Sequence, residues 1–129
     1  MYVYVKCRNN KKRQIVYDVI EHCYDILIKN LDIDLTVKFK SKLDDNANAW
    51  CQQNSHNTYQ IDVDSKLGLR TLIKTMCHEM VHVKQYVKGE LIDHRYWRGK
   101  EYNFRQPWEI EAYNLETILF RSFLKKRQK

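Results

Sequence analysis

The sequence predicts an α+β fold with an N-terminal helix, a small, mostly antiparallel sheet and two further helices. Three observations favour this class. Apolar residues recur at helical spacing in three segments, and they alternate with polar residues in short segments between the first two. The chain also contains only three glycines and one proline. Because turn material is so scarce, we expect most residues to lie in regular elements.

The predicted elements before the central helix include one helix and up to four strands. They are, in chain order, a weak strand at 2–5, a helix at 11–30, an alternating strand at 34–43, turn residues at 44–48, a candidate strand at 49–53 and an alternating strand at 58–63. Short strands that follow one another through tight turns favour antiparallel pairing. We therefore expect residues 34–63 to form a small antiparallel sheet.

The best-defined element is a helix that should begin after an N-cap at Asp64 or Ser65 and end near Lys88, where Gly89 supplies a stop. Its apolar residues form one continuous stripe of Leu69, Leu72, Ile73, Met76, Met80, Val83 and Val87. A polar, aromatic-rich connection at 90–106 follows. The last helix should begin at Pro107, since a proline is well tolerated at the first helical position. Its predicted buried residues are Ile110, Leu115, Ile118, Leu119 and Phe123.

Length and composition indicate one globular domain, 1–129. Hydrophobic residues make up 43% and charged residues 30% of the 129 residues, which is unlike a disordered chain. The first residues do not resemble a secretory signal, and no apolar segment is long enough to cross a bilayer. The four cysteines lack C-x-x-C spacing, so we expect free thiols. These features predict a cytoplasmic, monomeric protein without membrane contact.

The basic residues are clustered, and the net charge is +7. The clusters are Lys11, Lys12 and Arg13; Lys38, Lys40 and Lys42; Arg95, Arg98 and Lys100; and Lys125, Lys126, Arg127 and Lys129. Such clusters can contact nucleic acid or an acidic protein surface. A solvated basic face explains them equally well, so nucleic acid is a candidate partner only.

The central helix contains the motif H-E-x-x-H, formed by His78, Glu79 and His82. Residues four apart lie on one face of a helix, so both imidazoles can reach one metal ion. Glu79 lies about 100° further round, where its carboxylate can contact a metal-bound water without binding the metal. On a helical wheel the histidines lie opposite the apolar stripe, beside Gln85, and we expect them outside the core. The motif predicts a zinc site.

A catalytic zinc ion requires three protein ligands and an open position for water. The start of the last helix, after Pro107, offers two carboxylates, Glu109 and Glu111. They are two residues apart, so they point to nearly opposite sides of the helix and only one can reach the metal. Spacing alone leaves the choice between them open.

Together, the H-E-x-x-H helix and the later glutamate helix resemble the small gluzincins, which include SprT-like, ImmA-like and phage-encoded zincin-like peptidases. The resemblance covers the order of elements over nearly the whole chain, but only 78–82 and 109–112 match as motifs. It implies a zincin-like minimal core and zinc-dependent hydrolysis of peptide bonds, with Glu79 as general base. It also implies the host cytoplasm as the location if the protein is phage-encoded.

The resemblance selects Glu109 as the third metal ligand, beside His78 and His82, when the chains are aligned on Ala112. Many gluzincins carry an aspartate one turn later, which supports a metal-binding histidine. That position is Tyr113 here, so the supporting carboxylate must be replaced or absent.

The resemblance further implies that a protein or peptide substrate binds along an edge strand, for which 58–63 is the expected segment. Candidate donors to the developing oxyanion are His94, Arg95, Tyr96 and Tyr102. Trp97, Gly99, Lys100 and Tyr102 are candidates for the far wall of the cleft.

Two alternative functions remain open. One is a nucleic-acid-associated protein whose zinc site is not catalytic. The other is a regulatory protein that has kept a zincin fold without activity. An intact Glu79 argues against the second alternative, because a purely structural zinc site needs no general base.

Overall fold

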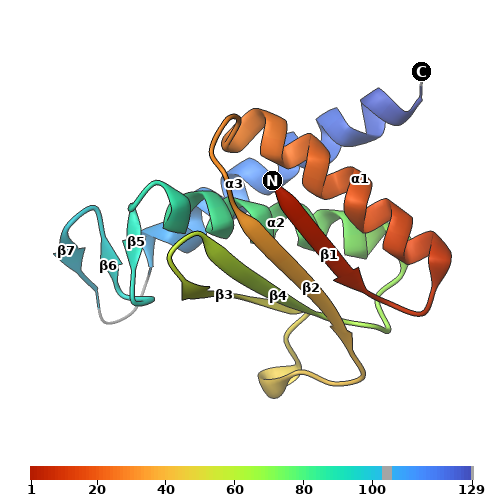
Figure 1. Cartoon of the computed structure of the whole chain (residues 1–129), viewed down its shortest axis with the longest axis horizontal. Helices are drawn as coiled ribbons and strands as arrows, with labels where there is room; N and C mark the ends of the chain where they lie inside the picture. Colours follow the sequence, from red (N-terminus) through yellow and green to blue (C-terminus); the bar gives the residue numbers. More distant parts are fainter. Residues whose placement is uncertain (103–105, 129) are drawn as a thin grey trace.

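The computed structural model describes residues 1–102 and 106–128 and combines helices with two small sheets, as the α+β prediction requires (Figure 1). The elements in chain order are β1 (Tyr2–Lys6), α1 (Asn10–Leu27), β2 (Asp34–Lys40), the short 3-10 helix η1 (Asp44–Asn46), β3 (Ala49–Ser55), β4 (Thr58–Asp64), α2 (Leu69–Val87), β5 (Leu91–Ile92), β6 (Tyr96–Trp97), β7 (Lys100–Glu101) and α3 (Pro107–Arg127). Most predicted elements are therefore present, with boundaries shifted by a few residues.

The prediction of a mostly antiparallel main sheet is wrong. The strand order is β1-β2-β4-β3, in which β1 pairs parallel with β2, β2 pairs parallel with β4, and only β3 and β4 are antiparallel. Helix α1 connects β1 to β2, and such a crossover returns the chain in the same direction. The chain then forms β3 at the edge of the sheet opposite β1 and turns back at His56–Asn57. It returns as β4, which lies between β2 and β3.

The position of β4 also corrects the expected edge strand. β4 is an internal strand between β2 and β3, whereas β3 pairs only with β4 among the described residues. The free backbone groups of β3 are thus exposed at the edge of the sheet. A peptide that adds to this side of the sheet would therefore pair with β3, not with 58–63.

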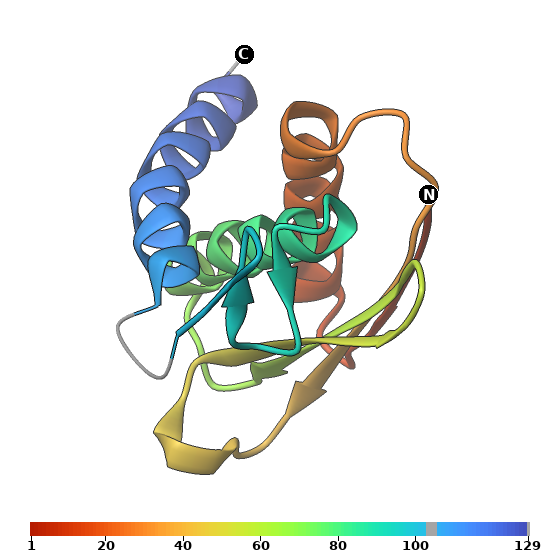
Figure 2. The same ribbon diagram turned by 90° about the vertical axis from the view of Figure 1, so that its left-hand side faces the viewer.

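Helices cover one face of the main sheet (Figures 1 and 2). The sheet residues on that face, including Leu35, Val37, Ile61 and Val63, are buried, and α2 packs between α1 and α3. The fully buried side chains of α2 include Leu72, Met76, Met80 and Val83. Burial of each stabilises the fold by about 1.5–3 kcal/mol, so α2 is a firmly held platform.

Helix α2 begins later than predicted, because β4 continues through Asp64. The N–H of Ser65 donates to the carbonyl of Lys40, and Asp64 accepts from the N–H of Lys66. These bonds extend the sheet and form a turn, so Gly68 is the N-cap. The predicted stop is confirmed: Gly89 has a φ of 71°, a left-handed conformation that glycine adopts without strain.

The connection after α2 forms the small sheet β5-β6-β7, although part of the predicted segment 90–106 lies outside the described residues, as does Lys129. Trp97 and Tyr102 pack against Trp108 at the start of α3. All four cysteines are free thiols. None of the helices in 1–102 and 106–128 has the length and apolarity needed to cross a bilayer.

Candidate metal centre

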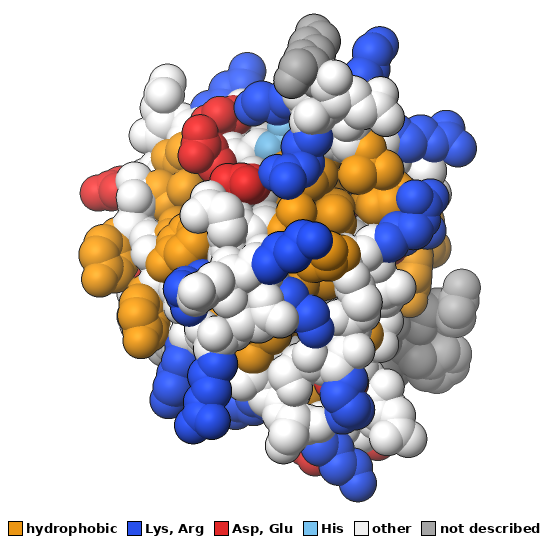
Figure 3. Space-filling view, turned by 90° about the vertical axis from the view of Figure 1, so that its right-hand side faces the viewer, with side chains coloured by type: hydrophobic (Ala, Val, Ile, Leu, Met, Phe, Trp, Pro, Cys, Tyr) orange, Lys and Arg blue, Asp and Glu red, His pale blue; other side chains and the backbone are white. Residues whose placement is uncertain are grey.

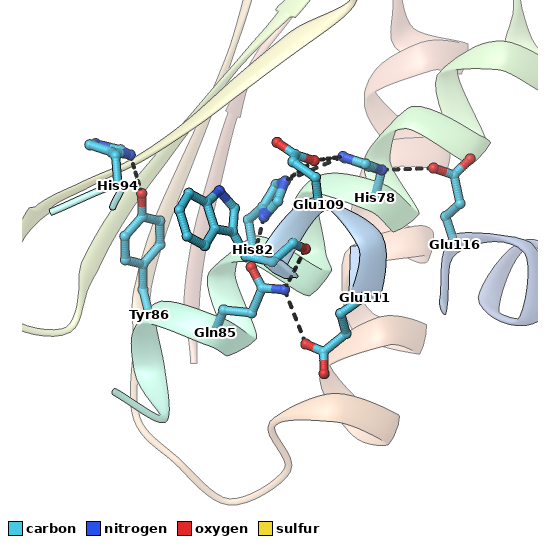
Figure 4. A network of polar contacts seen from close by, with 9 residues as sticks. His78, His82, Gln85, Tyr86, His94, Glu109, Glu111 and Glu116 are labelled. Carbon is cyan, nitrogen blue, oxygen red and sulfur yellow. Dashed lines mark hydrogen bonds and ion pairs between the residues drawn. The ribbon is translucent and has the colours of Figure 1, made fainter. Parts of the chain in front are cut away.

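Helix α2 places the two histidines of H-E-x-x-H side by side (Figure 4). His78 and His82 are one turn apart, their ring centroids are separated by 4.9 Å, and the rings lie nearly perpendicular. Their Nε2 atoms are 3.2 Å apart. The side chains thus direct the same type of nitrogen to one point, as the helical spacing predicts.

The third member of the group is Glu109, in the first turn of α3. Its Oε1 lies 2.9 Å from Nε2 of His78 and 3.1 Å from Nε2 of His82. These three residues form a group that could hold a metal ion, with one ligand atom from each. Two ligand atoms of a tetrahedral zinc ion are separated by about 3.3 Å, given Zn–N and Zn–O bonds near 2.0–2.1 Å. The observed separations therefore fit zinc.

Each histidine has a partner on its other ring nitrogen. Nδ1 of His78 lies 2.7 Å from Oε1 of Glu116, and Nδ1 of His82 lies 2.8 Å from Oε1 of Gln85. Both oxygens can only accept, so both Nδ1 atoms carry a hydrogen. The amide orientation of Gln85 is fixed because its nitrogen donates to the carbonyl of Trp108 and to Glu111. Nε2 is therefore the nitrogen of each ring that is available to a metal ion at the common point.

Glu116 takes the place of the supporting aspartate that the resemblance implies. The sequence has Tyr113 one turn after Glu109, where the resemblance implies an aspartate, but Glu116 lies two turns after Glu109 on the same face of α3 and contacts His78. The ring of Tyr113 packs edge-on against His78 at 4.7 Å. A search one turn further along the helix could have found Glu116, whereas the sequence carries no comparable signal for Gln85.

Glu111 faces away from the metal group. Its Oε1 accepts from Nζ of Lys84 at 2.9 Å and from the amide of Gln85 at 3.0 Å, while Lys84 also pairs with Glu90 at 2.8 Å. Glu111 therefore helps to hold α3 on α2, and it supports His82 only through Gln85. This arrangement favours Glu109 over Glu111 as the third ligand.

The face that carries the histidines is not solvated, contrary to the helical-wheel expectation. His82 is 7% exposed and Gln85 is fully buried. The reason is that α3 covers this face of α2, so that α2 is buried on both sides. An amphipathic wheel describes a helix with one covered face and could not anticipate the second.

Glu79 is almost completely buried beside the two histidines. It is 6% exposed, and it forms no hydrogen bond or ion pair with any side chain in 1–102 or 106–128. Burial raises the pKa of this carboxyl above its usual value, while His82 and His78 partly lower it. A carboxylate without a fixed partner and with a raised pKa is suited to accept and release a proton.

The carboxylates favour positive charge at the histidines. Burial alone lowers the pKa of His78, but hydrogen bonds to Glu109 and Glu116 and the charge of Glu79 raise it to about 9. Burial likewise opposes the charge on His82, and Glu109 and Glu79 raise its pKa. In return the histidines hold the pKa of Glu109 well below its usual range, against the effect of burial. The site is therefore built to receive a cation.

The group opens into a cleft of about 1140 Å³ whose walls come from β3, η1, α2 and α3. Of the four candidate oxyanion donors, only His94 lines it, where it contacts the hydroxyl of Tyr86. Arg95 and Tyr96 stack on each other and Tyr102 packs on Trp108, away from the cleft. The segment proposed as the far wall lies outside the lining as well. Three aromatic residues line the cleft that the sequence did not indicate as part of it: Trp50, Tyr86 and Tyr113.

Comparison of the chain with protein-family models, with curated proteins and with solved structures finds no match.

Proposed function

We propose that the chain is a zinc-dependent peptidase with a zincin-like core of the gluzincin type. The observation that carries this proposal is the convergence of His78 Nε2, His82 Nε2 and Glu109 Oε1 at one point, with the unpartnered Glu79 beside them. Two imidazoles and one carboxylate are the donor set of catalytic zinc sites that keep an open fourth position. Glu116 and Gln85 supply the supporting hydrogen bonds that such histidines require.

The chemistry divides between the ion and the chain. Bound zinc would polarise the scissile carbonyl and lower the pKa of a coordinated water toward neutrality. Glu79 would accept the proton of that water and deliver it to the leaving amine. Its burial keeps bulk water from competing for this proton.

The substrate would bind along β3, the exposed edge strand that borders the cleft. An extended peptide can pair with the free N–H and C=O groups of β3, and this pairing recognises the main chain whatever its side chains are. Because β3 lies against α2, a peptide bound there passes close to the metal group. The proposal therefore corrects the expected docking strand and keeps the expected mode of binding.

The proposal is tested by metal content and by cleavage. We expect purified protein to bind one zinc ion per molecule, and a double variant, His78→Ala with His82→Ala, to lose zinc because only Glu109 would remain. Elemental analysis measures the zinc content of both proteins. Mass spectrometry of new termini in a digested peptide mixture measures cleavage. If the wild-type chain fails to take up zinc, or if the double variant binds it as tightly, the proposal is wrong.

A second candidate function is binding of single-stranded nucleic acid at the other end of the molecule. A cavity of about 870 Å³ where β1 meets α1 is lined by four cations and no carboxylate: Lys6, Arg8, Lys12 and Arg13. None of the four forms an ion pair in the described part of the chain. Figure 3 views this side, where Lys and Arg outnumber Asp and Glu. Tyr4, half-exposed in the lining, could stack on a base.

Salt dependence tests this second candidate. The logarithm of the association constant for a fluorescent single-stranded oligonucleotide should fall linearly with the logarithm of the salt concentration, because each neutralised phosphate releases counterions. Lys6→Ala with Arg8→Ala should reduce the slope by about 1.4, which corresponds to two lost phosphate contacts. Lys29→Ala with Lys88→Ala, which removes the same charge away from the cavity, should leave the slope nearly unchanged. Equal slopes for the two double variants would exclude this cavity as the binding site.

A further inference from the structure

The cleft at the metal centre has a charge opposite to that of the whole chain. The protein has 23 Lys and Arg residues against 16 Asp and Glu. The described lining of the cleft contains no Lys or Arg, but it includes six carboxylates: Asp44, Asp45, Asp62, Glu79, Glu109 and Glu116. The Lys and Arg residues of 1–102 and 106–128 lie outside this lining, many of them on the side shown in Figure 3. Among the residues that the structure describes, the lining therefore carries an excess of negative charge, which attracts cations.

Most of these carboxylates are already accounted for. Glu109 and Glu116 contact the histidines, Glu79 would serve as the base, and Asp62 pairs with Lys40 at 3.4 Å. Glu109 belongs to the group that could hold the ion, and Glu79 lies beside that group, so both carboxylates offset part of the charge of a divalent ion. The remaining pair, Asp44 and Asp45, has no cationic partner in the part of the chain that the structure describes. Their charge is therefore directed at whatever enters the cleft.

The turn that carries this pair is fixed to the body of the protein at both ends. Leu43, directly before η1, is buried at 7% exposure, and the carbonyl of Asn48 accepts from the N–H of Asp64 on β4 at 2.8 Å. The carboxylates thus lie at the Ala49 end of β3, where a peptide paired with this strand would enter or leave. Trp50 follows directly on β3, is 47% exposed, and lines the same cleft.

We propose that Asp44, Asp45 and Trp50 form a subsite for one basic side chain, arginine or lysine, of a bound peptide; this deepens the peptidase function proposed above and rests on it. Two carboxylates supply the charge that the cation requires. An exposed indole supplies a face for a guanidinium or ammonium group and for its apolar stem. Glu79, which is buried and has no partner among the described side chains, lines the same cleft, so the subsite and the proposed base share one surface. The substrate class is therefore a peptide or protein segment with a basic residue that reaches the Ala49 end of β3.

Peptide binding to zinc-loaded Glu79→Gln protein tests the subsite without relying on catalysis. The probes are fluorescein-labelled alanine-rich peptides with one arginine at successive positions, each paired with a peptide that carries citrulline, a neutral side chain of the same shape. At one position we expect arginine to bind about five- to tenfold more tightly than citrulline in an anisotropy titration. Adding Asp44→Asn and Asp45→Asn should remove this preference. Asparagine tolerates the positive φ of 59° at Asp45, so the turn should persist.

A matched control removes the same charge elsewhere. Glu21 and Asp25 are exposed on α1 and do not line the cleft, so Glu21→Gln with Asp25→Asn should keep the arginine preference. Equal affinity for arginine and citrulline at every position, or a preference that survives the loss of Asp44 and Asp45, would overturn the subsite. If zinc-loaded wild type cleaves peptides without this preference, the subsite fails and the peptidase proposal stands. If the preference is present but no peptide is cleaved, the peptidase proposal fails instead.

Discussion

Substitution of Glu79 by glutamine is expected to slow peptide cleavage by about 10²–10⁴-fold, the range attributed to a positioned acid–base group. Glutamine has nearly the same size but cannot accept a proton from water. Glu79 forms no hydrogen bond or ion pair with the described side chains, so the exchange should not disturb the fold. Cleavage rates of a defined peptide, measured at saturating zinc, give the comparison.

The metal content of this variant is the necessary second measurement. Glu79 is not a member of the metal-binding group, so zinc uptake should remain equal to that of the wild type. Glu21→Gln makes the same chemical change on the exposed face of α1 and should retain full activity. A Glu79→Gln protein that keeps both its zinc and its activity would remove Glu79 from the mechanism.

Replacement of three carboxylates of α3 should weaken zinc binding to different extents, in the order Glu109, Glu116, Glu111. Glu109→Ala should remove zinc binding almost completely and abolish cleavage, because two histidines would remain. Glu116→Gln should weaken zinc binding by about 10–100-fold, since the hydrogen bond to His78 loses its charge. Glu111→Ala should retain zinc and lose about 1 kcal/mol of folding stability, because Lys84 keeps Glu90 and Gln85 keeps the carbonyl of Trp108.

Isothermal titration with zinc and thermal unfolding separate these three outcomes. The ratio of the Glu109→Ala effect to the Glu111→Ala effect is decisive, because the two residues share one helical turn and differ in direction. If Glu111→Ala lost zinc and Glu109→Ala kept it, the third ligand would be misassigned by two residues. The peptidase proposal would survive that result, since the H-E-x-x-H pair would still bind the ion.

The parts of the fold and site that depend on local sequence could be predicted. His78 and His82 meet because residues four apart share a helix face, which needs no knowledge of the rest of the chain. The antiparallel pairing of β3 with β4 is the part of the expected antiparallel sheet that the structure contains. Selection of Glu109 over Glu111 required the family resemblance, and the contacts of Glu111 with Lys84 and Gln85 favour the same choice.

The errors arise where distant segments meet. Ile110 and Ile118 were expected in the core but are 52% and 63% exposed, because the buried side of α3 is the side that carries Ala112 and Glu116. The apolar residues alone predict the wrong buried face of α3, since the polar residues of the metal centre occupy part of the buried face. The insertion of β4 beside β2, which made β3 the edge, is also a tertiary choice that alternation within a strand cannot reveal.

The division of the ligands between two helices has a consequence for the behaviour of the whole chain. His82 and Glu109 are 27 residues apart, so an ion bound to both closes a loop and acts as a removable cross-link between α2 and α3. Zinc that binds only the folded chain adds about 4 kcal/mol of stability at a free concentration a thousand times its dissociation constant. Chelation would remove this cross-link, and the start of α3, part of the wall of the cleft, would then be held by the bonds of Trp108 and Glu111 to α2. Zinc supply would thus set the lifetime of the folded protein as well as its activity.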